Sequence, residues 1–365
     1  MELRLKRSEL LAELVPMQGV VERKTTIPVL SHILLSARDD RVELKATDLD
    51  ISLTSWCEAE VKQEGGIAVQ ARKFMEIVRS LPDDEVFLMQ EDPKILSIRG
   101  GQSRFKLNGL APEDFPTLPE VGSEGGLEIP FVEFRRMISK VIFAVSAEES
   151  RFQLNGALLL QKENSFEMVA TDGHRLALVE VDVAGGQNGE GVLVPRKALQ
   201  ELQRFEGEGS LIFSRGEHHL SFEVGRRVLI SRILEGTFPD HERAIAKDND
   251  QKAIFETKAL LSTVQRVALL TGDRARSVRL HMSPGSLVVS TTNPDLGEAV
   301  EEISCEYEGK EIRIGINPDY LCQFLAAVDS EKIRLEVKDE NSQCVGYPVD
   351  GVDRRYLCVI MPMRI

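Results

Sequence analysis

One short segment of this 365-residue chain combines residue types that could perform acid–base chemistry. Asp172, Gly173, His174 and Arg175 follow one another within the run Ala-Thr-Asp-Gly-His-Arg-Leu-Ala-Leu at positions 170–178. A carboxylate, an imidazole and a guanidinium in one turn could act as general acid and base, or could present side chains to a binding partner. This turn is therefore the first candidate for a functional site.

Catalysis at this turn would need groups that the sequence does not supply. A general acid and base require a nucleophile, metal or cofactor within reach, and no Gly-x-x-x-x-Gly-Lys, His-x-Glu or Gly-x-Ser-x-Gly motif occurs. The pairs Gly65-Gly66, Gly100-Gly101 and Gly185-Gly186 are typical of hairpin turns rather than phosphate-binding loops. The five cysteines are scattered without a Cys-x-x-Cys pair, so we expect buried, reduced thiols. We predict no cofactor, no metal site and no enzymatic activity.

The same turn has echoes elsewhere in the chain. Ala46-Thr47-Asp48-Leu49 lies about 124 positions earlier, and Ser290-Thr291-Thr292-Asn293 lies about 120 positions later. At a similar offset, Asp114-Phe115-Pro116 is matched by Thr237-Phe238-Pro239-Asp240. A repeat of this length suits three similar domains. We place them at residues 1–121, 122–250 and 251–365.

Hydrophobic patterning gives each repeat one order of elements, a strand, a helix and three strands, followed by the same set again. Helical apolar stripes fall in six segments, 7–17, 71–80, 131–145, 196–206, 257–270 and 317–329. Asn317 followed by Pro318 is typical of a helix start. We therefore predict an α+β fold, with two helices per domain packed on antiparallel sheets.

The charge of the chain is unevenly distributed. A net charge of −14 argues against nucleic acid, because phosphate binding needs a basic surface. The six helical segments nevertheless sum to +4, which leaves −18 for the other residues. Arg72-Lys73 and Arg196-Lys197 recur at matching positions, with Arg135, Arg136 and Lys140 between them. A solvated outer face is the simpler interpretation for one helix, but the recurrence favours a face that contacts phosphate without reading bases.

The C-terminal segment predicts a second binding feature. Residues 359–365 read Val-Ile-Met-Pro-Met-Arg-Ile, and methionines beside a proline form an adaptable apolar surface that suits varied peptides. A closing core strand is the alternative, and the two are compatible because alternate side chains of a strand face opposite ways. No apolar run approaches the ~18 residues of a membrane helix, and the start of the chain lacks a signal-peptide pattern. We expect a cytoplasmic protein without membrane association.

Taken together, these motifs resemble the bacterial DNA polymerase III beta subunits, the processivity sliding clamps. The resemblance is carried by residues 170–178, 194–197, 238–240 and 359–365, and it extends in order over essentially the whole chain. It implies a head-to-tail homodimer whose six domains form a ring, with helices lining a basic hole and sheets outside. Such a ring would hold double-stranded DNA without sequence specificity and without catalysis.

The resemblance also implies site residues and partners. The partner-peptide cleft would comprise Leu154, Thr171, Gly173, His174, Arg175, Leu176, Pro239, Arg243, Tyr320, Val359, Ile360, Met361, Pro362, Met363 and Arg364. The DNA contacts would be Lys24, Arg72, Lys73, Arg196 and Lys197. The expected partners are the replicative polymerase alpha subunit, the clamp loader, and other polymerases and repair proteins that carry short linear motifs. Gln153 and Ala244 depart from the family pattern, in which an aromatic and a larger aliphatic residue are common.

Two other interpretations stay open from the residues alone. The chain could be a peptide-binding scaffold with no role on nucleic acid. It could also be an enzyme that uses Asp172 and His174. Assembly state and retention on closed circular DNA would distinguish these three hypotheses.

Overall fold

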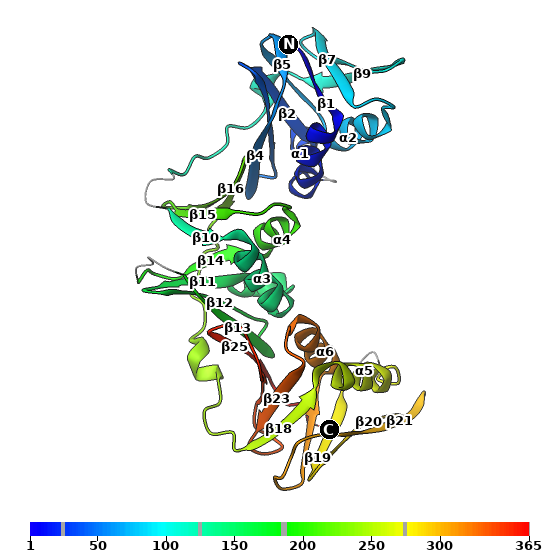
Figure 1. Ribbon diagram of the computed structural model, residues 1–365, viewed down its shortest axis with the longest axis vertical. Helices are drawn as coiled ribbons and strands as arrows, with labels where there is room; N and C mark the ends of the chain where they lie inside the picture. Colours follow the sequence, from blue (N-terminus) through cyan, green and yellow to red (C-terminus); the bar gives the residue numbers. More distant parts are fainter. Residues whose placement is uncertain (23–25, 123–125, 184–187, 273–275, 365) are drawn as a thin grey trace. The chain divides into compact units, whose positions relative to one another are not determined.

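The computed structural model describes residues 1–22, 26–122, 126–183, 188–272 and 276–364, and its elements follow the predicted repeat (Figure 1). The first repeat contains β1 (Glu2–Lys6), α1 (Arg7–Val20), β2 (His32–Arg38), β3 (Arg41–Thr47), β4 (Ile51–Glu58), β5 (Glu60–Gln63), β6 (Gly65–Gln70), α2 (Ala71–Ser80), β7 (Glu85–Asp92), β8 (Ile95–Gly100) and β9 (Ser103–Leu110). The second contains β10 (Leu127–Pro130), α3 (Phe131–Val141), β11 (Gly156–Lys162), β12 (Ser165–Thr171), β13 (Arg175–Asp182), β14 (Val192–Pro195), α4 (Arg196–Arg204), β15 (Ser210–Arg215), β16 (His219–Val224) and β17 (Arg227–Arg232).

The third repeat has the same order as the second. It contains β18 (Gln251–Glu256), α5 (Thr257–Ala268), β19 (Val278–Ser283), β20 (Ser286–Asn293), β21 (Gly297–Ser304), β22 (Ile312–Ile316), α6 (Pro318–Ala327), β23 (Lys332–Val337), β24 (Cys344–Pro348) and β25 (Arg355–Ile360). Short 3₁₀ helices, among them η4 (Glu149–Leu154) and η5 (His241–Ala244), occupy some of the connections. The α+β prediction with two helices per repeat is therefore confirmed for the described residues.

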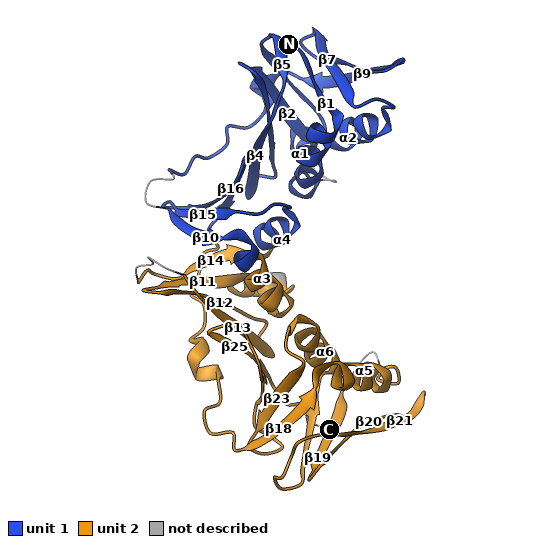
Figure 2. Cartoon of the chain, viewed as in Figure 1, with its two compact units in different colours: residues 1–134, 197–233 blue, residues 135–196, 234–365 orange. Residues whose placement is uncertain are grey.

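Two compact units divide the chain (Figure 2). Unit 1 comprises residues 1–134 and 197–233, and unit 2 comprises residues 135–196 and 234–365. Among the described residues, unit 1 has one antiparallel sheet in the order β10-β15-β16-β17-β4-β3-β2-β6-β9-β8-β7-β1-β5. Unit 2 has two, β14-β11-β12-β13-β25-β24-β23-β18 and β21-β20-β19-β22. The second repeat contributes to both units, and the predicted domain limits stay a prediction.

Within each unit, strands of successive repeats join into one sheet by the same rule. In unit 1, β4 of the first repeat pairs antiparallel with β17 of the second, and Leu53 lies opposite Leu229. In unit 2, β13 of the second repeat pairs antiparallel with β25 of the third, and Leu178 lies opposite Leu357. In both junctions, the third strand after the first helix of one repeat pairs with the last strand of the following repeat.

The helices form where the apolar stripes and caps predict them. On α2, Phe74 and Val78 are fully buried, and the Gln70 side chain caps the helix by accepting a hydrogen bond from the Lys73 backbone N–H at 2.7 Å. Asn317 caps α6 in the same way through the Asp319 N–H at 2.9 Å, so the predicted helix start is confirmed. In the described part of the chain, no helix combines the length and apolar character needed to cross a membrane.

The expectations for glycines and cysteines are only partly met. Gly101, with φ +56°, lies in the tight connection between β8 and β9, as predicted. Gly65-Gly66 was predicted to be a hairpin turn, which is wrong because these residues begin β6 and pair with the end of β2. The pair Gly185-Gly186 lies outside the described residues. Three cysteines, Cys57, Cys344 and Cys358, are buried free thiols, whereas Cys305 and Cys322 are half-buried.

Candidate functional site

The candidate turn is built by side chains that bond to its own backbone. Thr171 Oγ1 donates to the Arg175 carbonyl at 2.6 Å and accepts from the Gly173 N–H at 3.1 Å. Asp172 Oδ1 accepts from the N–H groups of His174 and Arg175 at 2.9 and 3.0 Å. Gly173 has φ +89°, a left-handed conformation that favours glycine. The turn is thus fixed by its sequence, and it leaves the His174 side chain exposed.

Arg175 points into unit 2 and ties several elements together. Its Nε donates to Asp172 Oδ2 at 3.0 Å, and its two Nη groups donate to Gln323 Oε1 on α6 and to the Phe143 carbonyl. The guanidinium lies 4.3 Å from the centre of the Tyr320 ring, within cation–π range. With only 9% of Arg175 exposed, these bonds replace its water. Arg175 is therefore a structural anchor as much as a surface group.

The C-terminal segment lies beside this turn. Val359 and Ile360 end β25, next to β13, and are 1% and 2% exposed. The Met361 N–H donates to the His174 carbonyl at 2.9 Å, and the Met363 N–H donates to the Gly315 carbonyl at 2.7 Å. The Met361 side chain is 40% exposed. The core-strand interpretation of the tail therefore holds for β25, and a peptide-binding surface formed by the residues after it stays a prediction.

An apolar cluster lies beneath the turn, the tail and η5. Its buried members are Leu154, Val169, Leu176, Leu178, Leu193, Phe238, Ile245, Val345, Leu357 and Val359. Five further apolar residues pack against it and stay partly exposed, namely Leu158, Leu234, Ala244, Ala246 and Tyr347. Predicted cleft residues Leu154, Leu176 and Val359 thus belong to one cluster whose edge reaches solvent. Such an edge can bury an apolar side chain of a bound peptide.

The other predicted cleft residues surround this cluster in unit 2. Pro239 and Arg243 are exposed on the segment before and within η5, and Arg243 Nε bonds to Asp240 Oδ2 at 2.8 Å. Pro362 and Met363 are half-buried and Arg364 is exposed. Whether all fifteen residues contact a peptide stays a prediction, but every one of them belongs to the same unit.

The geometry of the turn gives no acid–base pair. Both oxygens of Asp172 are occupied, one by two backbone N–H groups and the other by Arg175. Burial raises the pKa of the Cys344 thiol to about 12, so this cysteine is a poor nucleophile near neutral pH. Asp172 accepts a hydrogen bond from the His174 backbone N–H. General acid–base catalysis by this pair would instead need a contact between the carboxylate and the imidazole.

The predicted DNA contacts have different surroundings. Arg72 and Lys73 lie in the first turn of α2, with side chains 74% and 62% exposed, and both pair with Glu76 at 2.8 Å. Lys197 donates to the Asp48 carboxylate and, at 3.3 Å, to the Val20 carbonyl, which leaves its side chain 40% exposed. Arg196 is half-buried at the start of α4. Lys24 lies outside the described residues.

Two of the cations on α3 are paired with acidic residues and do not form part of a free basic face. Lys140 of α3 was counted toward a basic face, but it is 2% exposed and pairs with Asp353 at 2.7 Å and Asp329 at 2.8 Å. Arg136, one turn earlier, pairs with Asp353 at 2.6 Å. The acidic partners lie nearly 200 positions or more away in the sequence, so a count along one helix could not reveal them. Lys140 therefore supplies no accessible positive charge.

Comparison with known proteins identifies the family. Three models of the DNA polymerase III beta subunit match in order, the N-terminal domain at residues 1–119, the central domain at 128–240 and the C-terminal domain at 242–364. The chain belongs to the beta sliding clamp family. The beta sliding clamp of Pseudomonas putida is 36% identical over 369 residues, covering 100% of both chains. Members of this family are non-catalytic processivity factors, so the enzyme hypothesis is not supported.

Solved sliding clamps have the same three-domain fold. The DNA polymerase III subunit beta of Pseudomonas aeruginosa superposes with a TM-score of 0.94 at 35% identity, covering 100% of each chain. The sliding clamp of Bartonella birtlesii, in a structure with griselimycin bound, gives a TM-score of 0.95 at 33% identity, again over 100% of each chain. Both the fold and the sliding-clamp function predicted from the sequence are thereby confirmed.

Sequence reasoning missed three residues that hold the turn. Phe143 and Gln323 accept hydrogen bonds from Arg175, and Arg151 Nη1 donates to the Asp172 carbonyl at 3.2 Å. A methyl group in place of the Gly173 hydrogen would lie 2.7 Å from Arg151 Nη1. No motif contains these residues, because they contribute through tertiary contacts.

Proposed function

We propose that two copies of this sliding clamp close into a ring around double-stranded DNA. The carrying observation is the junction rule described above, which β4·β17 and β13·β25 both follow. Applied once more, it pairs β21, the third strand after the first helix of the third repeat, with β9, the last strand of a first repeat. β21 belongs to the third repeat and β9 to the first. We therefore expect β21 of one copy to pair with β9 of a second copy, and the reverse, so that the two copies close head to tail.

The two strands suit such a junction. β21 is the outer strand of its sheet, and among the described residues β9 pairs with β8 at residues 103–108 and with β6 only at Gly109 and Leu110. Arg104 and Lys106 on β9 are exposed, as are Glu298 and Glu302 on β21. Opposite charges and unpaired backbone groups favour strand addition between copies. Val300, 59% exposed near the middle of β21, adds apolar surface.

DNA contact in the ring would come from exposed cations on the helices. The pairs that Arg72 and Lys73 make with Glu76 are solvent-exposed, and surface ion pairs contribute little, so phosphate can replace the carboxylate at small cost. Such contacts carry no base information and let the ring slide. Retention on DNA would then depend on closure of the ring rather than on affinity.

Partners would bind at the apolar cluster. An extended peptide could place an apolar side chain against Leu176 and Val359 and meet the exposed groups of His174, Arg243 and Met361 around it. The replicative polymerase alpha subunit, the clamp loader and other polymerases and repair proteins would share this surface in turn, in the cytoplasm. The binding of griselimycin by the Bartonella birtlesii relative supports a ligand site in the family.

Assembly tests the ring directly. Light scattering after size exclusion should give about twice the 40.7 kDa chain mass. Val300→Asp should yield monomers, because it places a charge in the proposed junction, whereas Val352→Asp, at a valine outside β21 that is still more exposed, should not. Loaded by a clamp loader, the wild type should be retained on nicked circular DNA and released on linearisation. Equal retention on both DNAs would contradict encirclement.

Peptide binding has its own test. Fluorescence anisotropy with a labelled C-terminal peptide of the polymerase alpha subunit should show saturable binding, with griselimycin added as a competitor. Removal of residues 361–365 should abolish binding and leave the dimer intact, since the tail lies in unit 2 away from β21 in the sheet order. Loss of the dimer in this variant would mean that the tail is structural.

A further inference from the structure

The segment that carries Pro239 and Arg243 is attached to unit 2 at both ends by apolar side chains. Phe238 and Ile245, 9% and 6% exposed, belong to the apolar cluster. Between them the chain forms η5, with Pro239 and Arg243 exposed to solvent. Six residues separate the two anchors, and a single 3₁₀ turn has few internal hydrogen bonds. The position of this segment must therefore depend on its other side chains.

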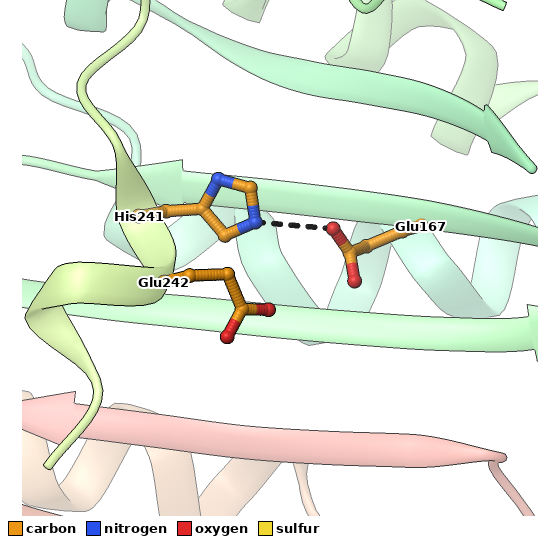
Figure 3. A group of neighbouring side chains, drawn as sticks. All are labelled: Glu167, His241 and Glu242. Carbon is orange, nitrogen blue, oxygen red and sulfur yellow. Dashed lines mark hydrogen bonds and ion pairs between the residues drawn. The ribbon is translucent and has the colours of Figure 1, made fainter. Parts of the chain in front are cut away.

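His241 supplies the first of these attachments. Its ring points toward Glu167 on β12, and Nε2 lies 3.1 Å from Glu167 Oε1 (Figure 3). Glu167 is 1% exposed and also accepts from Lys162 Nζ at 2.8 Å. Burial would raise the pKa of Glu167, but the hydrogen bonds from His241 and Lys162 lower it overall, so the carboxylate is charged at neutral pH. The bond from His241 is thus charge-assisted.

Glu242 supplies the second attachment, to a different strand. Its oxygens accept from Nη1 and Nη2 of Arg355 at 2.6 and 3.3 Å, a two-bond contact with the first residue of β25. The hydrogen bond from Arg355 lowers the pKa of Glu242, which keeps the pair ionised. Consecutive residues of η5 therefore bind β12 and β25, the strands that carry Thr171 and Val359 of the proposed peptide site.

Metal binding is a less suitable interpretation of this group. The ligand atoms of Glu167, His241 and Glu242 lie within 4.8 Å of one another, as a metal site would require (Figure 3). Lys162 and Arg355, however, already bond to the two carboxylates. A divalent cation would have to displace both or share the site with two positive charges. The protein's own cations take the place that a metal would occupy.

We propose that His241 and Glu242 are positioning residues for partner binding, which fasten η5 so that Pro239 and Arg243 form a fixed wall beside the apolar cluster. This inference rests on the proposed peptide site. Without the two attachments, η5 would sample several positions, and only one of them would be able to bind the peptide. The apparent affinity for the peptide would then fall in proportion to the fraction of molecules in that position. The two residues act through the segment and need not touch the peptide.

A graded set of variants tests the proposal with the labelled alpha-subunit peptide as probe. The double variant His241→Ala, Glu242→Ala should weaken binding about tenfold by raising the share of incompetent positions. His241→Gln, whose amide can still donate to Glu167, should bind within about twofold of the wild type. The matched control is Glu217→Ala, His218→Ala, which removes the same residue types from an exposed pair in unit 1 and should change nothing.

Hydrogen exchange separates positioning from general loss of stability. In the double alanine variant, the amides of residues 238–245 should exchange faster, those of β12 and β25 should keep their protection, and added peptide should restore the segment. Unchanged affinity despite faster exchange, or weaker affinity with unchanged exchange, would overturn the inference. Zinc binding by the wild type that tightens the peptide would also overturn it in favour of a metal site. If the wild type itself fails to bind the peptide, the proposed function fails instead.

Discussion

The turn at residues 47–51 and the turn at residues 171–175 have the same internal hydrogen bonds but different uses. In the first, Thr47 Oγ1 donates to the Ile51 carbonyl at 2.9 Å, and Asp48 Oδ1 accepts from two backbone N–H groups at 2.9 and 2.7 Å. The second repeats every one of these bonds. A threonine and an aspartate therefore specify the turn, and they say nothing about function.

The neighbours of the two turns decide what each can do. In unit 1, the free oxygen of Asp48 binds Lys197 on α4, and Ile51 is buried. In unit 2, the corresponding oxygen of Asp172 binds Arg175, which stands at the position of Ile51 and reaches α6. One turn is closed by a helix that docks on it. The other carries its own cation, which bonds to α6, and its exposed tip belongs to the proposed partner site.

The corresponding helix positions show the same division. Gln323 on α6 matches Glu201 on α4, since each is the sixth residue of its helix. Gln323 accepts from Arg175, whereas Glu201 fits against Gly19, where an added methyl group would lie 1.8 Å from Glu201 Oε2. The two turns thus share a backbone while the side chains at two equivalent positions differ, toward a packed junction in unit 1 and toward the proposed binding site in unit 2.

Converting one turn into the other should have the largest effect. Arg175→Ile copies the residue at position 51 and removes the donor to the Phe143 carbonyl and to Asp172 Oδ2, so we expect β13 to lose about 3 kcal/mol of stability. Native-state hydrogen exchange of the β13 amides measures this. Arg243→Ile is the matched control, because Arg243 has the same three-residue spacing from an aspartate but is 87% exposed. Equal losses in both variants would show that Arg175 is only a surface cation.

The docking of α4 gives the next largest effect. Lys197→Met should destabilise unit 1 by about 2 kcal/mol, because it leaves the buried Asp48 carboxylate without its cation. Trp56, the single tryptophan, lies on β4 and reports urea unfolding of unit 1. Lys73→Met, which removes only an exposed pair, should cost less than about 0.5 kcal/mol. If the two variants lose the same stability, the Lys197–Asp48 pair contributes no more than an exposed surface pair.

A smaller effect concerns the tip of each turn. Leu49 has φ +80° and is 47% exposed, so it carries left-handed strain without compensating burial. Leu49→Gly, which copies Gly173, should stabilise unit 1 by about 1 kcal/mol in the same urea assay. Gly173→Ala should do the opposite in unit 2, through strain and contact with Arg151. A destabilised Leu49→Gly variant would show that this side chain packs against something in the dimer.

The sequence could predict what depends on local pattern. Both turns, the six helices and the placement of Thr171 and Asp172 follow from periodicity and side-chain capping, which act within a few residues. The roles of Lys140 and Lys197 could not be predicted, because their partners come from distant segments that only the fold brings together. His241 was passed over for the same reason, since Glu167 lies 74 positions away. Sequence motifs can therefore locate a candidate site, but the charged residues that hold it in place are found only from the tertiary structure.

The smallest expected effect concerns the pH dependence of the stability of unit 1, which depends on Glu201. Burial raises the pKa of Glu201 above its usual value of 4.5, although Arg204 and Lys197 act against this. An acid with a raised pKa supports folding while it is protonated, and that support is lost as pH rises through its folded-state pKa. Glu201→Gln, which copies Gln323, should therefore match the wild type below pH 4.5 and exceed it at pH 7, by about 1 kcal/mol. Trp56 fluorescence in urea at both pH values measures the difference in unfolding free energy between the variant and the wild type. A difference that shrinks toward pH 7 would contradict a raised pKa for Glu201.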